Sequence, residues 1–246
     1  MSGNKCICFA AWLILTSLTC SQAMAGVVIT GTRLLYPAGQ KELTVKLNNN
    51  SVRPALVQAW VDTGDPHSTP TNARAPFVLS PPVSRINPGK GQSLRLIFTG
   101  AQLPDNRESV FWLNVLDIPP KPDSPADANL LQMAFRSRIK IFYRPQGLPG
   151  TAADAPQQLH WSVVSKDQGY ALQAFNPTAF HVSEVDLALV AGNQRHESEN
   201  GMVAPGETRL FALPTLKSMP GAGAQVELNA VNDFGAFIPL KQSLRP

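Results

Sequence analysis

No cysteine is left in this sequence once its first 25 residues are set aside. The three cysteines of the chain are Cys6, Cys8 and Cys20. Segment 1–25 carries Lys5 as its only charge, continues as an apolar run and ends in Ala-Met-Ala, which is typical of a secretory signal peptide. We therefore expect residues 1–25 to be a signal peptide, and the exported chain to be stabilised by core burial without any disulfide.

Long apolar runs are also scarce. The run between Ile7 and Leu18 is short for a membrane anchor, and no later run approaches the roughly twenty apolar residues that a spanning helix needs. Charged residues make up 15% of the chain, the formal net charge is +4, and no block of like charge forms a basic arm. We therefore expect neither a membrane anchor nor a nucleic-acid partner.

Patterns of catalytic or metal-binding residues are missing too. The four histidines are His67, His160, His181 and His196. They have no metal-ligand spacing, so we expect surface or loop positions for them. Asp105, Glu108 and Asp117 are close in sequence, but nothing indicates a shared pocket, and Asn49–Ser51 is only a formal glycosylation acceptor. No nucleophile motif or phosphate-binding glycine loop occurs. The sequence gives no support for an enzyme, a metal site or a cofactor.

What the sequence does contain is a series of β-strand patterns. Short alternating or β-branched segments are separated by glycine, asparagine and many of the 22 prolines. After Pro145 the composition changes to a stretch rich in Gly, Ala, Pro and Gln, and the strand patterns then resume. This predicts an all-β protein of two antiparallel sandwich domains, 26–147 and 148–246.

The segment from Asn129 to Pro145 is the most unusual strand pattern. Large apolar residues occupy alternate positions: Leu131, Met133, Phe135, Ile139, Ile141 and Tyr143. Basic residues occupy the other parity: Arg136, Arg138, Lys140 and Arg144. Because alternate side chains of a strand point to opposite faces, this predicts one long strand with an apolar face and a basic face. The pattern leaves open what the strand pairs with.

Arg33 is a second unusual position. Alternation in the segment 27–37 predicts that Arg33 shares a face with Val27, Ile29 and Leu35. A guanidinium on an apolar face is costly unless an anion meets it. The anion is either an internal carboxylate or a carboxylate that docks from another molecule, and Lys140 presents the same choice.

These residues lie in motifs that resemble a known family. "GTRLLYP", "PPVSRINPGKGQSLRL", "LPDNRESVFWLNVLDIPP" and "LLQMAFRSRIKIFYRP" follow one another between Gly31 and Pro145, and "VNDFGAF" follows near the C-terminus. In this order they closely resemble the periplasmic pilus-assembly chaperones of Gram-negative bacteria. The resemblance implies two immunoglobulin-like β-sandwiches arranged as a boomerang, with the binding cleft between them.

The resemblance also implies roles for individual residues. Arg33 and Lys140 match the two cations that anchor the C-terminal carboxylate of a pilus subunit. Leu131, Met133 and Phe135 match the alternating apolar residues that the chaperone inserts into the subunit, completing its fold by donor-strand complementation. This favours an external anion for Arg33 over an internal one.

A second group matches an ionic cluster that orients the two domains in the family: Glu108, Arg144 and Asp233. The alternative is an ordinary surface ion pair of little energetic weight.

The short "KPDSPADAN" segment and the lack of a cysteine pair resemble the short-loop branch, which serves rod-like pili. The implied partners are pilus subunits and an outer-membrane usher, and self-capping of the free protein as a homo-oligomer is left open. The rival hypothesis is a secreted structural or adhesive β-sandwich, either a pilus subunit or a lectin.

Overall fold

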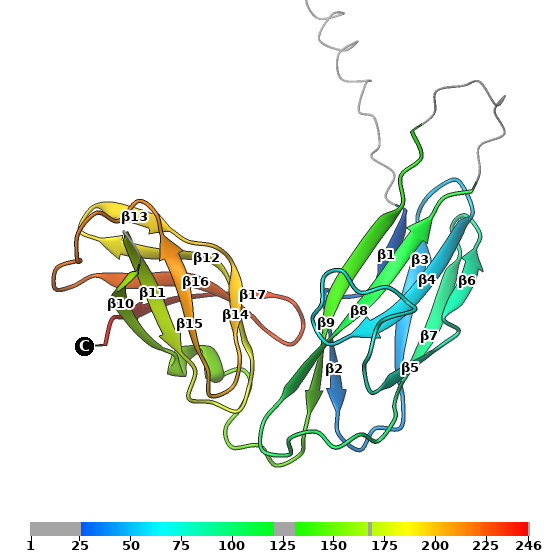
Figure 1. Cartoon of the computed structure of the whole chain (residues 1–246), viewed down its shortest axis with the longest axis horizontal. Helices are drawn as coiled ribbons and strands as arrows, with labels where there is room; N and C mark the ends of the chain where they lie inside the picture. Colours follow the sequence, from blue (N-terminus) through cyan, green and yellow to red (C-terminus); the bar gives the residue numbers. More distant parts are fainter. Residues whose placement is uncertain (1–25, 121–130, 167–168, 246) are drawn as a thin grey trace, which may run out of the picture.

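The computed structural model describes residues 26–120, 131–166 and 169–245. Figure 1 shows two lobes of β-sheet that are joined at one end and diverge from there, like the arms of a boomerang. Apart from the short 3-10 helix η1 (Ala155–Gln158), all regular elements in these ranges are strands. No helix among the described residues is long and apolar enough to cross a membrane. The predicted all-β fold class is confirmed.

The N-terminal lobe is a sandwich of two sheets. Their strand orders are β1-β3-β7-β5 and β2-β9-β8-β4-β6. The strands are β1 (Val27–Ile29), β2 (Arg33–Pro37), β3 (Leu43–Asn49), β4 (Ala55–Asp62), β5 (Phe77–Ser80), β6 (Val83–Ile86), β7 (Gly91–Phe98), β8 (Ser109–Ile118) and β9 (Phe135–Arg144). Strands such as β3 bury every second side chain, so each sheet contributes one apolar face to the core. Tyr36 lies fully buried among these faces, and its hydroxyl donates to the carbonyl of Gln40.

The C-terminal lobe repeats this construction with sheets of order β10-β11-β15 and β13-β12-β16-β17, and β14 pairs with β12. Its strands are β10 (His160–Lys166), β11 (Gly169–Phe175), β12 (Val182–Ala191), β13 (Gln194–Glu197), β14 (Gly201–Val203), β15 (Thr208–Leu213), β16 (Gln225–Val231) and β17 (Phe237–Ser243). Trp161 and Phe211 lie fully buried in its core. The hydrophobic clusters of the two lobes are separate, as expected for two sandwiches that each bury their own core.

The chain changes sheet at Gly31, and this corrects the predicted environment of Arg33. Gly31 has a φ of 95°, a conformation that favours glycine, and it separates β1 in one sheet from β2 in the other. Within β2 the buried side chains are Leu34 and Tyr36, whereas Arg33 lies on the opposite face. The prediction that Arg33 shares the face of Val27 is therefore wrong, because the sheet change breaks the alternation.

The long strand predicted from Asn129 is shorter than expected. β9 begins at Phe135, and residues 131–134 before it have no regular secondary structure. Residues 129 and 130 of the predicted strand lie outside the described residues. Phe142 is buried although it has the parity of the basic residues, because it faces His181 of the C-terminal lobe. Phe142 therefore interrupts the basic face of the strand.

The formal glycosylation acceptor Asn49 has a structural role. Its side chain is fully buried, and its amide nitrogen donates to the carbonyls of Arg53 and Ile86. Its side-chain oxygen accepts hydrogen bonds from the backbone and the hydroxyl of Ser51. The amide is thus fully used inside the folded protein and is inaccessible to a glycosyltransferase.

Candidate binding site between the lobes

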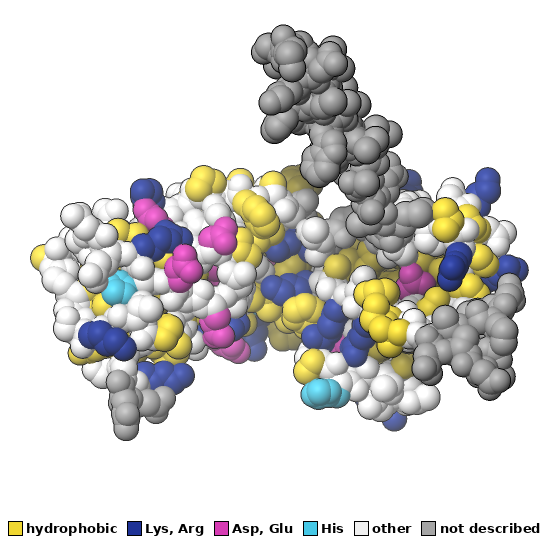
Figure 2. Space-filling model, turned by 90° about the horizontal axis from the view of Figure 1, so that it is seen from above, with side chains coloured by type: hydrophobic (Ala, Val, Ile, Leu, Met, Phe, Trp, Pro, Cys, Tyr) yellow, Lys and Arg dark blue, Asp and Glu magenta, His cyan; other side chains and the backbone are white. Residues whose placement is uncertain are grey.

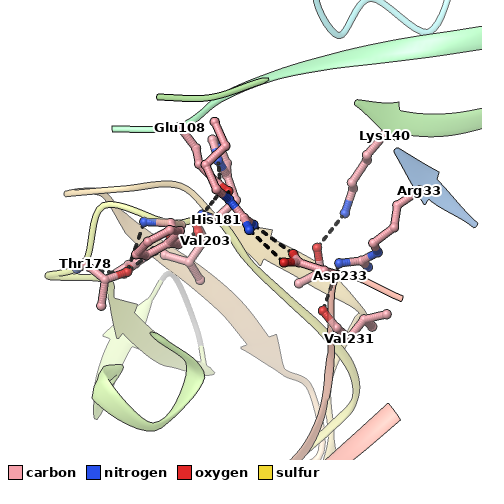
Figure 3. Close-up of polar contacts among 12 residues, drawn as sticks. Arg33, Glu108, Lys140, Thr178, His181, Val203, Val231 and Asp233 are labelled. Atoms are coloured by element: carbon pink, nitrogen blue, oxygen red, sulfur yellow. Dashed lines mark hydrogen bonds and ion pairs between the residues drawn. The ribbon is translucent and has the colours of Figure 1, made fainter. Parts of the chain in front are cut away.

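Strand pairing places the two predicted anchor residues side by side. β2 runs parallel to β9, and in this register Arg33 is the partner of Lys140. On the other side of β9, Lys140 is the register partner of Trp112 of β8, and Trp112 is the partner of Asp62 of β4. Figure 3 shows Arg33 and Lys140 extending from these strands toward the C-terminal lobe. Two cations from segments about a hundred residues apart thus meet where the two lobes face each other.

Lys140 is held in a partly dehydrated position. Its Nζ donates to Ser183 Oγ of β12 at 3.1 Å and lies 5.5 Å from the ring of Trp112. Burial and, to a smaller extent, the neighbouring charge of Arg33 lower the pKa of Lys140 to about 8, while the charge of Glu184 opposes the shift. The ammonium group is therefore poorly stabilised in the free protein, and an incoming anion would stabilise it.

Arg33 contacts the other strand of the same C-terminal sheet. Its Nη1 donates to the carbonyl of Val231 at 2.8 Å, and its Cζ lies 5.4 Å from the ring centre of Phe142. Its Nε is buried without a hydrogen-bond partner. Burial lowers the pKa of Arg33, whereas the charges of Asp233 and Glu108 raise it.

Neither cation has an ion-pair partner within 4.0 Å among the residues that the structure describes. The internal carboxylate considered as one alternative for Arg33 is therefore not found in this part of the chain. Each cation instead donates to a neutral oxygen of the other lobe: Arg33 to the carbonyl of Val231, and Lys140 to the hydroxyl of Ser183. Such neutral bonds are weaker than bonds to a carboxylate, so a carboxylate ligand can replace them favourably.

Glu184 is a third charged group of this region, and it belongs to none of the predicted site residues. It lies next to Ser183 on β12, is fully buried, and neither carboxylate oxygen has a hydrogen-bond partner. Burial raises the pKa of Glu184 to about 8, although the charges of Arg209 and Lys140 oppose this. A glutamate inside an apolar strand pattern was the available signal for such a perturbed carboxyl group.

Glu184 leads to a prediction about stability. The pKa of Glu184 is about 8 in the folded chain and near the ordinary glutamate value of 4.5 in the unfolded chain. A raised pKa stabilises the fold fully below the unfolded pKa, and this contribution is lost as the pH rises through the folded pKa. Relative to wild type, the free energy of unfolding of Glu184→Gln should therefore rise by about 3–4 kcal/mol between pH 5 and pH 8. Urea unfolding of both proteins at both pH values measures this, and an identical difference at the two values would contradict it.

The predicted ionic cluster is brought together at the junction of the lobes. Arg144 Nε donates to Glu108 Oε1 at 2.6 Å, and its two Nη atoms donate to the carboxylate of Asp233 at 2.7 and 2.8 Å. Burial alone would lower the pKa of Arg144, but the bonds to Asp233 and the charge of Glu108 raise it. Arg144 and Glu108 come from the N-terminal lobe and Asp233 from the C-terminal lobe, so the hydrogen bonds of the cluster connect the two lobes.

His181 also belongs to this junction. Its backbone N–H donates to Glu108 Oε2 at 2.8 Å, and its Nδ1 lies 3.3 Å from the same oxygen (Figure 3). The backbone N–H of Glu108 donates in turn to Ala179. Only 4% of the His181 side chain is exposed, and His196 is buried as well. His181 therefore lies in a loop, as predicted, although its side chain is buried, whereas His196 is buried on β13 and its predicted surface or loop position is wrong.

The three carboxylates that lie close in sequence do not converge. Glu108 belongs to the ionic cluster, Asp117 accepts a hydrogen bond from the backbone of Val27, and Asp105 is exposed. Within the described ranges no group of three or more His, Cys, Asp or Glu residues is arranged to hold a metal ion.

The predicted donor residues lie at the free end of β9. Leu131, Met133 and Phe135 are 85%, 54% and 61% exposed, which is unusual for side chains of this size. β2 pairs with β9 only over Lys140–Arg144, whereas β8 pairs with it from Phe135 to Tyr143. Among the described residues, the edge of β9 from Phe135 to Ile139 opposite β8 therefore has no paired strand. Figure 2 shows hydrophobic and basic side chains gathered in the space between the lobes.

Two family models match the chain, one for each lobe. The model of the pili and flagellar-assembly chaperone, PapD N-terminal domain, matches residues 26–149. The model of the pili assembly chaperone PapD, C-terminal domain, matches residues 154–242. Together these ranges cover most of the chain.

Individual relatives match over nearly their full length. The probable fimbrial chaperone YadV of Escherichia coli (strain K12) is 41% identical over 235 residues, which are 94% of this chain and 94% of the relative. The chaperone protein HifB of Haemophilus influenzae is also 41% identical, over 238 residues, with 95% and 94% covered.

Solved structures of chaperones have the same fold. The crystal structure of the YadV chaperone matches with a TM-score of 0.77 at 39% identity, covering 89% of this chain and 100% of that one. A chain from the structure of the Salmonella enterica SafA pilin in complex with the SafB chaperone matches with a TM-score of 0.72 at 26% identity, covering 91% and 99%.

Proposed function

Because the chain belongs to the family of pili assembly chaperones, we propose that it is a periplasmic chaperone that binds pilus subunits by donor-strand complementation and delivers them to an outer-membrane usher. In this proposal residues 1–25 are the export signal, and no cofactor takes part. The observation that carries it is the unpaired edge of β9 beside the cation pair Arg33 and Lys140. A lectin or a pilus subunit is less well supported, because β9 completes the N-terminal sandwich.

The edge of β9 supplies the backbone part of recognition. Addition of a strand to an exposed sheet edge is the known mode of chaperone–pilin complexes, and backbone hydrogen bonds give it affinity. The subunit strand would pair with the side of Phe135–Ile139 that faces away from β8. In the free protein this edge is a liability for aggregation, and pairing removes it.

The apolar side chains supply the second part. Phe135 and, in extended continuation of β9, Met133 and Leu131 have the parity that would enter a groove in the subunit. Removing such a side chain from water contributes about 1.5–3 kcal/mol. Residues 131–134 are not a strand in the free chain, so we propose that they extend β9 when the subunit binds.

The cations fix the register of the added strand. Arg33 and Lys140 are adjacent, and a subunit carboxylate can accept charge-assisted hydrogen bonds from both. A shift of one residue along β9 would turn the apolar side chains away from the groove, so an anchored chain end has a large effect on specificity. The cluster of Arg144, Glu108 and Asp233 would keep the lobes at the angle that this contact requires.

The pKa of Lys140 predicts a pH dependence of binding. A bound carboxylate favours the charged ammonium group, so the pKa of Lys140 would rise from about 8 on binding and a proton would be taken up. Above this pH Glu184 also becomes charged and repels the carboxylate. Affinity should be nearly constant below pH 7 and fall about tenfold between pH 7 and pH 9. Calorimetric titration with a subunit measures this.

Lys140→Arg is the control for this dependence, because a guanidinium keeps its charge over the whole range. The affinity of this variant for the subunit should depend on pH only through the weaker effect of Glu184. An affinity that rises with pH in the wild type would contradict the proposed anchor.

The proposed function is tested directly by co-expression with candidate subunits in the periplasm. We expect at least one subunit to become soluble and to co-purify with the chain, because its open groove is covered. If every subunit of the cognate pilus accumulates equally well without this chain, the proposed function is wrong.

The assignment to the short-loop branch stays a prediction, since residues 121–130 lie outside the described part of the chain. Self-capping of the free protein as a homo-oligomer also stays a prediction.

A further inference from the structure

The first half of β9 lacks the usual means of staying in place. Over Phe135–Ile139 it has one neighbouring strand instead of two, and the side chain of Phe135 is 61% exposed. An edge segment with few buried apolar contacts opens at low free energy cost. Yet a donor strand that is disordered before binding must be ordered during binding, which reduces affinity and slows association.

Two arginines tie this half of the strand to the rest of the sheet. Arg138 Nη2 donates to Asp62 Oδ1 at 2.7 Å, and Arg136 donates to Asn114 Oδ1 from Nε at 2.9 Å and from Nη2 at 2.6 Å. Arg136 also donates to the carbonyl of Pro66 at 2.8 Å. The bonds reach β8, β4 and the segment that follows β4, so they cross the sheet instead of running along β9.

The same arginines stack on two tryptophans. The Cζ of Arg138 lies 4.2 Å from the ring centre of Trp112, and that of Arg136 lies 4.9 Å from the ring centre of Trp60. The stacking positions the planar guanidinium groups, so less side-chain freedom is lost for each hydrogen bond formed.

Asp62 is the fixed acceptor of this network. It is 1% exposed and also accepts hydrogen bonds from Ser68 Oγ at 2.6 Å, from Asn114 Nδ2 at 2.7 Å and from the backbone N–H of Gly64 at 2.7 Å. A buried carboxylate with this many donors is firmly oriented. Arg138 is therefore bonded to a rigid part of the N-terminal lobe and not to a mobile surface group.

The network uses only one face of the strand. Arg136 and Arg138 point to the face of Lys140, whereas Phe135, Ser137 and Ile139 have the opposite parity. The backbone edge away from β8 is also left unpaired within the described ranges. The strand is thus held without occupying either the apolar side chains or the edge that a subunit would bind.

We infer that Arg136 and Arg138, held by Asp62, Asn114 and the two tryptophans, are positioning residues that keep Phe135–Ile139 extended before the subunit arrives. This inference rests on the proposed function and deepens it. Of the basic residues in the first part of β9, Arg136 and Arg138 then bond within the N-terminal sheet. Lys140 is the next basic residue along the strand and is left for an external carboxylate. The subunit meets an ordered strand, and less ordering remains to be done during binding.

The test uses Arg136→Gln in the mature, full-length protein, because Asp62 keeps its bond from Arg138 in this variant. In the free variant, the amides of residues 135–139 that bond to β8 should exchange about tenfold faster, those of 140–143 should be unchanged, and the thermal midpoint should be nearly unaltered. The rate constant for association with a subunit should fall several-fold, while dissociation changes less, since the bound subunit itself holds the strand. Arg136→Lys should keep part of the slow exchange at residues 135–139 and part of the fast association of the wild type.

Arg95→Gln is the matched control, because Arg95 is an exposed arginine of β7 whose pair with Glu42 is 3.8 Å long. It should change neither exchange nor association. Unchanged exchange at 135–139 in Arg136→Gln would overturn the inference, and so would faster exchange with unaltered association. Arg138→Gln serves as a second variant with the same criteria. If the wild type binds no subunit, the proposed function fails, but the exchange measurement still decides whether the arginines hold the strand.

Discussion

Replacement of Arg33 or Lys140 by alanine is expected to abolish recovery of the pilus subunit from the periplasm while the chaperone itself stays folded and exported. Each variant removes one of two adjacent cations, and no carboxylate among the described residues is left unpaired by the loss. Because hydrogen bonds between charged groups contribute about 1.5–3 kcal/mol each, we expect subunit affinity to fall at least about tenfold per variant. Immunoblots of periplasmic extracts and titration of purified proteins measure this.

Arg95→Ala is the control for these two variants, because it removes an exposed cation of the same lobe far from the junction in strand order. It should leave subunit levels normal. If subunit levels stay normal in Arg33→Ala and Lys140→Ala as well, these residues are not the anchor.

Phe135→Glu is expected to abolish co-purification of the subunit by a different route. Phe135 is 61% exposed in the free chaperone, so the substitution should leave the stability of the chaperone nearly unchanged. In the complex, however, a carboxylate would replace a side chain whose burial contributes about 1.5–3 kcal/mol, and it would itself have to be buried without a partner. We expect a loss of affinity of about a hundredfold or more, measured by pull-down and by titration.

Phe135→Leu is the matched control, since it keeps an apolar side chain at the same position and should retain most of the affinity. Val52→Glu places the same charge at another exposed apolar position of this lobe, where 70% of the side chain is accessible, and should have no effect. Unchanged co-purification of the subunit with Phe135→Glu would remove the support for donor-strand binding.

Much of the fold follows from alternation of residue types, but the binding site does so only in part. The strand patterns and the absence of long helices predict two all-β lobes, because each strand shows which face it buries. The neighbouring positions of Arg33 and Lys140 cannot be derived from alternation, since they depend on a parallel pairing of β2 with β9. The resemblance to a family was needed to bring these two positions together.

Other errors have local physical causes. Alternation continued through Gly31 predicts the wrong environment for Arg33, because the positive φ of this glycine lets the chain change sheet. Leu131 and Met133 continue the strand pattern, but they lie beyond the start of β9 in the free chain. Alternating side chains alone do not make a segment form a strand when no neighbouring strand pairs with it. In the proposed complex, the subunit would supply that neighbouring strand.

Two residues of the junction gave only weak signals in the sequence. His181 has no ligand spacing, and its burial beside Glu108 results from the packing of one lobe on the other. Glu184 lies in an apolar strand pattern, which does not show what covers its face of the strand, and it is fully buried near Lys140. Positions at the contact of two lobes combine residues from both, and alternation within one strand carries no information about such contacts.

The central claim is that a subunit strand pairs with the edge of β9 that faces away from β8. Amide hydrogen exchange of Phe135–Ile139, compared between the free chaperone and its complex with a subunit, measures this directly. We predict that the amides on this edge become strongly protected in the complex, because each gains a backbone hydrogen bond. Complex formation that leaves these amides exchanging at the rate of the free protein, with protection appearing elsewhere, would contradict the account.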